Sequence, residues 1–302
     1  MGSDAFFRMG STHAICQDYA IAGSHKGTAY AIVSDGCSGV STKDEPGSPF
    51  TDYGARFITR AARLILPAFD ETLMMLHAQQ MAVAACLPAS CLDATAIVAK
   101  KEKKGVRVHQ CGDGVIAARD RRTGQIAYMA TSFDSNMPFY PSYLLTPAIR
   151  ARYLRTTRSM TLKTGGQIEG GAWKSGDLIE IPLNHEESES SVGVQTHFFP
   201  DSFDVVLIMS DGAESFQNAA NGQPVPLTDV LEQLFAFKGF EGEFITRRCT
   251  RFLHKFCVEK GWKHTDDLSV AGIYVPQTED SGGGEIYAPR TEPGSPNSDV
   301  LL

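Results

Sequence analysis

The stretch AIVSDGCSG, residues 31–39, joins an apolar run to the tripeptide Ser-Asp-Gly, and the stretch LIMSDGAES, residues 207–215, repeats this pattern. An apolar run with β-branched residues predicts a strand. Because Asp-Gly readily forms a tight turn, each stretch can simply be a strand that reverses. The alternative interpretation is that two strand ends deliver carboxylates to one shared place, where they need a positive partner.

Two further carboxylate sites lie where predicted strands begin or end. Asp113 stands in CGDGV between two predicted strands, and Asp266 precedes Asp267 and the last predicted strand in KHTDDLSVAGIYV. Taken singly, each aspartate is most simply a turn residue, and Asp113 in particular can be the turn of a hairpin. Taken together with Asp35 and Asp211, they favour a site for a hard cation such as Mg²⁺ or Mn²⁺, because these ions prefer oxygen ligands.

Composition and charge narrow the class of protein. The chain has 302 residues, of which 42% are hydrophobic and 21% charged, as is typical of soluble globular proteins. The net charge of -7, with no prominent basic stripe, argues against nucleic-acid binding. Seven cysteines without a CxxC pair predict neither a disulfide framework nor a zinc site. No apolar run reaches the roughly 18 residues of a membrane span, so we expect a cytoplasmic protein with no membrane partner.

The order of predicted elements indicates the fold class. We expect strands near residues 18–22, 29–34, 95–99, 106–111, 115–119, 126–130, 178–181, 205–209 and 268–275. We expect helices within residues 51–69, over 71–87 and over 245–256. Helices that gather in two blocks, rather than one after each strand, favour an α+β fold with largely antiparallel sheets over a doubly wound parallel sheet.

The domain organisation follows from changes in composition. We expect one domain over residues 1–276, interrupted by an irregular insert or flap at about 132–171, which is rich in Pro, Tyr and Arg, and by an acidic loop at about 184–200. The segment KKEKK at residues 100–104 is interpreted as a solvated hairpin tip. Residues 277–302 are rich in Gly, Pro and Ser and are predicted to be a disordered tail.

An ordered series of motifs adds a family resemblance. The series HAICQDYA, VSDGCSG, CLDATAIVA, HQCGDGVIAARD, IMSDGAESF and TDDLSVAGI resembles that of the metal-dependent PPM phosphatases, also called the protein phosphatase 2C family, in its divergent bacterial branch. The resemblance runs from about residue 5 to Val275. No single motif is specific, but their order and spacing are. The resemblance implies a four-layer fold, with two stacked antiparallel β-sheets flanked by helix pairs.

The same resemblance implies a binuclear Mn²⁺ or Mg²⁺ centre at one end of the sandwich. Asp35 matches the carboxylate that bridges both ions, and Gly36 matches the residue whose carbonyl binds one of them. Asp211 and Asp266 match ligands of the other ion. Asp113 matches an aspartate that helps to hold a third, weaker ion. In such a centre, two cations lower the pKa of a bridging water, and the resulting hydroxide attacks the phosphoryl group in line.

The first motif carries a further acid and a departure from the family pattern. Asp18 matches an acid that typically acts through metal-bound water. His13 stands where many relatives carry an arginine that grips the substrate phosphate, and it can still donate a hydrogen bond to phosphate. Cys37 replaces a histidine that is a candidate general acid in eukaryotic members, so the leaving group must take its proton from metal-bound water or another residue such as His264.

The function that the resemblance implies is hydrolysis of phosphoserine and phosphothreonine in proteins, so the expected partner is a phosphoprotein, itself the target of a serine/threonine kinase. Two alternatives remain open. A pseudophosphatase would bind phosphoproteins without turnover; His13, Gln17 and Cys37 favour it, whereas the complete set of aspartates opposes it. A phosphatase for small metabolites would share the chemistry and differ only in its substrate.

Overall fold

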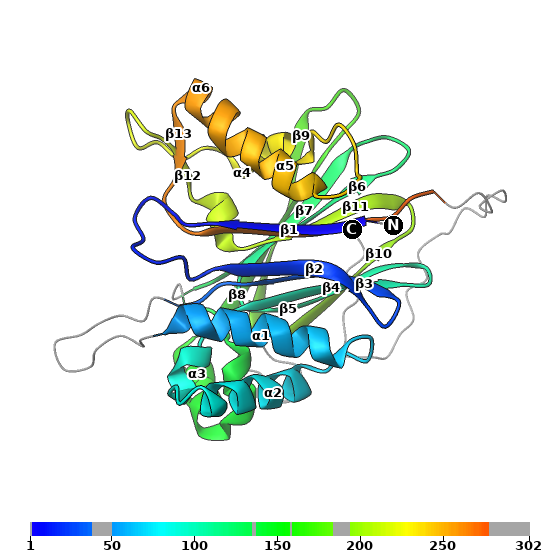
Figure 1. Cartoon of the computed structure of the whole chain (residues 1–302). Helices are drawn as coiled ribbons and strands as arrows, with labels where there is room; N and C mark the ends of the chain where they lie inside the picture. The colour runs from blue at the N-terminus through cyan, green and yellow to red at the C-terminus, as the bar shows by residue number, and fades with distance from the viewer. Residues whose placement is uncertain (1, 38–49, 135–136, 158, 184–193, 278–302) are drawn as a thin grey trace.

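The structure is a computed structural model that describes residues 2–37, 50–134, 137–157, 159–183 and 194–277. Figure 1 shows two sheets stacked face to face in the middle of the molecule, with helices on both outer sides. Every strand pair is antiparallel. The predicted α+β architecture of two antiparallel sheets between helix layers is therefore confirmed. The predicted tail and most of the predicted acidic loop lie outside the described residues.

Among the residues that the structure describes, one sheet has seven strands and the other has five. The seven-stranded sheet contains, in spatial order, β1 (Gly2–Arg8), β14 (Leu268–Tyr274), β11 (Phe203–Met209), β6 (Gly114–Asp120), β7 (Ile126–Phe133), β8 (Ser159–Gln167) and β9 (Trp173–Pro182). The five-stranded sheet contains β10 (Val194–Pro200), β5 (Gly105–Cys111), β4 (Ala96–Glu102), β3 (Thr28–Ser34) and β2 (Tyr19–His25). A small separate ladder joins β12 (Phe216–Asn218) to β13 (Trp262–His264).

The outer layers are two groups of helices. On the five-stranded sheet lie α1 (Thr51–Ile65) and α2 (Glu71–Ala84), and on the seven-stranded sheet lie α4 (Leu227–Phe235) and α5 (Phe244–Arg251) (Figure 1). The chain also forms α3 (Pro147–Thr156), α6 (Val258–Lys260), the short helices η1 (Ala89–Leu92), η2 (Pro141–Leu145) and η3 (Asp211–Glu214), and the π-helix η4 (Phe252–Cys257). Within the described ranges, no helix has the length and apolar character that a membrane crossing requires.

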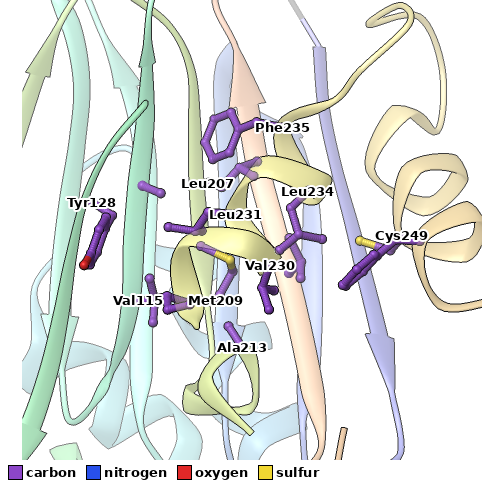
Figure 2. Close-up of a cluster of buried hydrophobic side chains, with 14 of the residues drawn as sticks. Val115, Tyr128, Leu207, Met209, Ala213, Val230, Leu231, Leu234, Phe235 and Cys249 are labelled. Atoms are coloured by element: carbon purple, nitrogen blue, oxygen red, sulfur yellow. The ribbon is translucent and has the colours of Figure 1, made fainter. Parts of the chain in front are cut away.

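The central strands are buried on both faces. On β11, Val206 and Ile208 pack between the two sheets, whereas Val205, Leu207 and Met209 pack under the helices. Figure 2 shows this second face, with side chains of α4 lying over Leu207 and Met209. A strand that is covered on both sides needs apolar residues at every position, which explains why VVLIM is a continuous run and not an alternating pattern.

The structure corrects the interpretation of residues 132–171 as irregular. This segment contains the end of β7, the helices η2 and α3, and strand β8. Phe139, Tyr153 and Met160 are buried there in a small core together with Cys111 of β5. Its aromatic residues follow neither a helical nor a strand period, so the pattern gave no signal. The helix predicted over 245–256 is confirmed, and its second half, η4, has π-helical hydrogen bonding directly after α5.

Candidate active site

The strand register brings the predicted acidic residues to one end of the sandwich. Asp18 precedes β2 and Asp35 follows β3, and Tyr19 lies opposite Ser34 in that ladder. In the other sheet, Asp211 follows β11 and Asp266 precedes β14, and there Met209 lies opposite Val270. Antiparallel neighbours begin and end at the same edge, so both pairs of acids are placed where the two sheets terminate.

Asp113 reaches this end by a route that the sequence did not reveal. It lies between β5 and β6, which belong to different sheets, so the hairpin interpretation is wrong. Gly112 and Gly114 have φ angles of +99° and +128°, which favour glycine. A Cβ on Gly112 would lie 2.7 Å from Cγ2 of Thr95, and a Cβ on Gly114 would lie 2.6 Å from the carbonyl oxygen of Met209. The two glycines therefore allow the chain to cross tightly between the sheets.

The carboxyl groups from the two sheets are in contact. Asp35 lies beside Asp18 and beside Asp211 of the seven-stranded sheet, and after burial itself it is the charges of these two acids that raise the pKa of Asp35. Asp18 is only 1% exposed. The charge of Asp266 acts in turn on Asp211. The acids that lie far apart in the sequence thus form one cluster, which is the condition that a shared cation site requires.

Burial and mutual repulsion disfavour the charged forms of these acids. Burial, reinforced by the neighbouring carboxylates, raises the pKa of Asp35 and of Asp113 well above the ordinary range. Burial also raises the pKa of Asp18 to about 7 and that of Asp211 to about 6; the charge of Asp211 adds to the first shift, and that of Asp266 adds to the second. Hydrogen bonds to Asp18 and Asp211 oppose these shifts without cancelling them.

The donor set fits a hard divalent cation. No three His, Cys, Asp or Glu side chains within the described part of the chain already have the arrangement of a metal site. However, Oδ1 of Asp18 and Oδ1 of Asp211 are buried without a hydrogen-bond partner, so two oxygens of the cluster are free to accept a ligand. The backbone of Gly36 is fixed beside them by a β-bridge to Ala94. Carboxylate and carbonyl oxygens are the ligands that Mg²⁺ and Mn²⁺ prefer.

His13 lies between two carboxylates. Its Nε2 is 3.4 Å from Oδ1 of Asp266, and its Nδ1 is 3.1 Å from Oδ2 of Asp267. Burial alone would lower the pKa of His13, but the hydrogen bond to Asp267 and the charges of both aspartates raise it overall. The structure thus places His13 at the edge of the cluster, and its contact with a substrate phosphate stays a prediction.

Asp267 has a role that the sequence did not separate from that of Asp266. The Asp267 carboxylate is 1% exposed and accepts hydrogen bonds from the backbone N–H of Gly10, at 2.7 Å, and of Gln17, at 2.5 Å. The neighbouring Asp266 side chain is 41% exposed. Asp267 therefore binds residues 9–17, which precede Asp18, to the turn before β14. The more exposed Asp266 side chain can bind a ligand. The alternation of side chains at the start of a strand could have indicated this difference.

Two more residues of the cluster were missed. The hydroxyl of Ser210 donates a hydrogen bond to Oδ2 of Asp18 at 2.7 Å. Glu214, at the end of η3, adds a negative charge that raises the pKa of Asp113 and of Asp211, after burial itself. The repeated Ser-Asp-Gly pattern was a signal for Ser210, whereas the place of Glu214 depends on how η3 turns after β11.

The residues just after Asp35 are held by Asp93, which in turn binds a residue of the segment 132–171. The backbone N–H of Cys37 donates to the carbonyl of Asp93 at 3.0 Å, and Ser142 of η2 donates to the carboxylate of Asp93 at 2.8 Å. The side chain of Tyr140 interacts with that of Cys37. Residues around η2 therefore border the candidate site. Nδ1 of His264 lies 2.9 Å from the carbonyl oxygen of Asp266, and the role of His264 as an acid stays a prediction.

Comparison with known proteins gives a structural likeness only. No protein-family model matches the sequence, and neither does any curated protein sequence. The serine/threonine phosphatase Stp1 from Staphylococcus aureus is 12% identical and matches over 92% of this chain and 96% of its own, with a TM-score of 0.49. Two variants of a bacterial serine phosphatase match with TM-scores of 0.51; one is 11% identical over 91% of this chain and 99% of its own, the other 12% identical over 92% and 98%. These two matches show that the chain has the fold of the bacterial PPM-type serine/threonine phosphatases.

Proposed function

We propose that this protein hydrolyses phosphoserine and phosphothreonine in phosphoproteins, the targets of a serine/threonine kinase, with Mn²⁺ or Mg²⁺ bound at the carboxylate cluster. The observation that carries the proposal is the position of Asp35, which lies beside Asp18 of its own sheet and Asp211 of the other sheet and interacts electrostatically with both. Such a cluster does not stabilise the fold, because burial raises the pKa of its members and so makes their charged forms unfavourable. A role in binding cations accounts for it.

The residues divide the work of the site. Asp35, Asp211, Asp266 and the carbonyl of Gly36 would hold two ions, and Asp113 would contribute to a third. Bound together, the ions would lower the pKa of a shared water and neutralise the phosphoryl oxygens. The protein itself positions the acids by strand register and keeps them at the buried end of the two sheets. Since Asp18 is buried and hydrogen-bonded, it is suited to hold or accept a proton inside the cluster.

The activity is tested most simply with a chromogenic aryl phosphate. We expect Mn²⁺-dependent hydrolysis by the wild-type protein and a loss of at least about a hundredfold in the Asp211→Asn variant, because a metal contributes several kcal/mol to the stabilisation of the transition state. The proposal of catalysis fails if added Mn²⁺ gives the wild-type protein no activity beyond that of the Asp211→Asn variant. Phosphopeptides and small phosphorylated metabolites, assayed side by side, then separate protein substrates from metabolites.

A pseudophosphatase is the alternative that the position of His13 favours. His13 is engaged by Asp266 and Asp267, and its ring therefore has less freedom to contact a phosphate than an unpaired side chain would have. Calorimetric titration separates the two functions. An enzyme should bind at least two Mn²⁺ ions, as the number of carboxylates in the cluster supports, whereas a scaffold for phosphoproteins should show no tight Mn²⁺ site.

The metal-dependent stability should vary with pH. The pKa values of Asp18 and Asp211 are raised to about 7 and about 6, so the metal-free fold is most stable where these acids are protonated and loses stability as the pH rises from their unfolded values towards their folded ones. Mn²⁺ relieves this repulsion and competes with protons. We therefore expect Mn²⁺ to raise the melting temperature more at about pH 8 than at about pH 5. An equal shift at both pH values, measured by calorimetry, would place Mn²⁺ away from these acids.

A further inference from the structure

The serine of the second Ser-Asp-Gly sequence connects the two sheets at the site. Ser210 follows β11 in the seven-stranded sheet and is 1% exposed. Its Oγ donates to Oδ2 of Asp18, which precedes β2 in the five-stranded sheet, over 2.7 Å. The same oxygen accepts a hydrogen bond from the backbone N–H of Ser269 at 3.0 Å. Because Ser269 occupies an acceptor position of the hydroxyl, the hydroxyl hydrogen is left for Asp18.

This hydrogen bond determines which oxygen of Asp18 is left for the cluster. A second possible acceptor, the carbonyl oxygen of Asp267, lies at 3.4 Å from the Ser210 hydroxyl, so Asp18 at 2.7 Å is the better one. With Oδ2 bound to Ser210, Oδ1 of Asp18 remains buried and without a hydrogen-bond partner.

We infer that Ser210 is a positioning residue of the proposed phosphatase reaction: its hydroxyl orients the Asp18 carboxylate from the opposite sheet. The kinetic consequences of this role rest on the proposed function. The hydrogen bond from Ser210 to Asp18 does not depend on turnover. Ser210 itself contacts no substrate in this account. Its effect is transmitted only through Asp18.

The first Ser-Asp-Gly sequence supplies a matched control. Ser34 also precedes an Asp-Gly pair at the end of a central strand, and its side chain is completely buried. Its hydroxyl donates to the carbonyl oxygen of Thr95 at 2.5 Å and not to an acid of the cluster. The substitutions Ser210→Ala and Ser34→Ala therefore each remove one buried hydroxyl. Ser210→Ala loses the bond to Asp18 and the bond from Ser269, Ser34→Ala loses the bond to Thr95, and only Ser210→Ala removes a bond to a site carboxylate.

The kinetic test compares three variants with saturating Mn²⁺. We expect Ser210→Ala to lower kcat for an aryl phosphate by about tenfold or more, the usual effect of one hydrogen bond to a charged group, with KM little changed. Ser210→Thr, which keeps the hydroxyl, should recover most of kcat, and Ser34→Ala should keep it. Equal kcat values for Ser210→Ala and Ser34→Ala, or no recovery in Ser210→Thr, would overturn the inference.

A crystal structure of the metal-free Ser210→Ala variant gives a readout that does not depend on activity. The Asp18 carboxylate should leave the position that it has here, whereas in Ser34→Ala it should keep it. If Asp18 keeps its position in Ser210→Ala, the inference is wrong. If the wild-type protein shows no Mn²⁺-dependent turnover, the proposed function fails, and the position of Asp18 in the two variants alone decides the role of Ser210.

Discussion

Replacing Asp35 with asparagine should abolish the Mn²⁺ response of the protein while stabilising its metal-free form. Asp35 contacts Asp18 and Asp211, and by its match to the family motif it is the residue expected to touch both ions. Loss of the ligand shared by both ions should lower Mn²⁺-dependent hydrolysis by about a hundredfold or more. It should also remove most of the rise in melting temperature that Mn²⁺ gives the wild-type protein.

Asp35→Asn should lower the activity but raise the stability of the metal-free protein, and this gain follows from the raised pKa of Asp35. Burial, together with the charges of Asp18 and Asp211, raises the pKa of Asp35 well above its usual value. Above that pKa, the ionised group destabilises the fold, and this cost disappears as the pH falls and the acid is protonated. A neutral asparagine avoids the cost, so the metal-free Asp35→Asn variant should melt above the wild-type protein at about pH 8, and by a smaller margin at about pH 5.

Asp93 provides the control for both effects. It is also a half-buried acid whose pKa is raised by burial, but its carboxylate is hydrogen-bonded to Ser142 and not to another acid of the cluster. Asp93→Asn should therefore keep the Mn²⁺-induced rise in melting temperature. An Asp35→Asn variant that behaves like Asp93→Asn in the melting experiments would contradict the assignment of Asp35.

Removing the Asp267 carboxylate should cause a large loss of stability. In Asp267→Ala, the backbone N–H groups of Gly10 and Gln17 lose the acceptors that lie 2.7 Å and 2.5 Å away, and His13 loses one of its two carboxylate neighbours. Breaking a buried charged contact of this kind costs about 3–5 kcal/mol of unfolding free energy. Chemical denaturation at neutral pH measures the difference directly.

The adjacent residue separates this structural role from metal binding. The Asp266 side chain is 41% exposed, and its removal leaves the hydrogen bonds of the Asp267 carboxylate to Gly10 and Gln17 in place. Asp266→Ala should therefore weaken Mn²⁺ binding with a much smaller loss of stability than Asp267→Ala. If instead Asp267→Ala unfolds no more easily than Asp266→Ala, residues 9–17 are held by their other contacts, such as those of Ser11 with His264.

The fold was predictable from the sequence where the burial of an element's two faces produced a recognisable pattern of apolar residues. Continuous apolar runs such as VVLIM predicted the central strands, and the gathering of helices in two blocks predicted the sandwich. The position of Asp35 and Asp211 at strand ends was visible for the same reason. Their mutual contact was not, because it depends on how two sheets stack, and no local pattern records that.

The parts that the sequence did not reveal depend on tertiary contacts of single side chains. Asp266 and Asp267 are identical as residues, and only the packing of residues 9–17 buries one of them. Asp113 resembled a hairpin turn in the sequence. The chain passes there from one sheet to the other through the positive φ angles of Gly112 and Gly114, which no local pattern predicts. The small core around Phe139 and Tyr153 has no period, since its aromatic residues come from loops and short helices.

The central claim is that Asp35, Asp211 and Asp266, together with the carbonyl of Gly36, bind a pair of divalent ions where the two sheets end. The most direct measurement is a crystal structure of the wild-type protein soaked in Mn²⁺, with data collected at the manganese absorption edge. We expect two anomalous peaks, both in contact with Asp35 and one of them also in contact with Asp211 and Asp266. Fully soaked crystals with no peak at Asp35 would contradict this assignment.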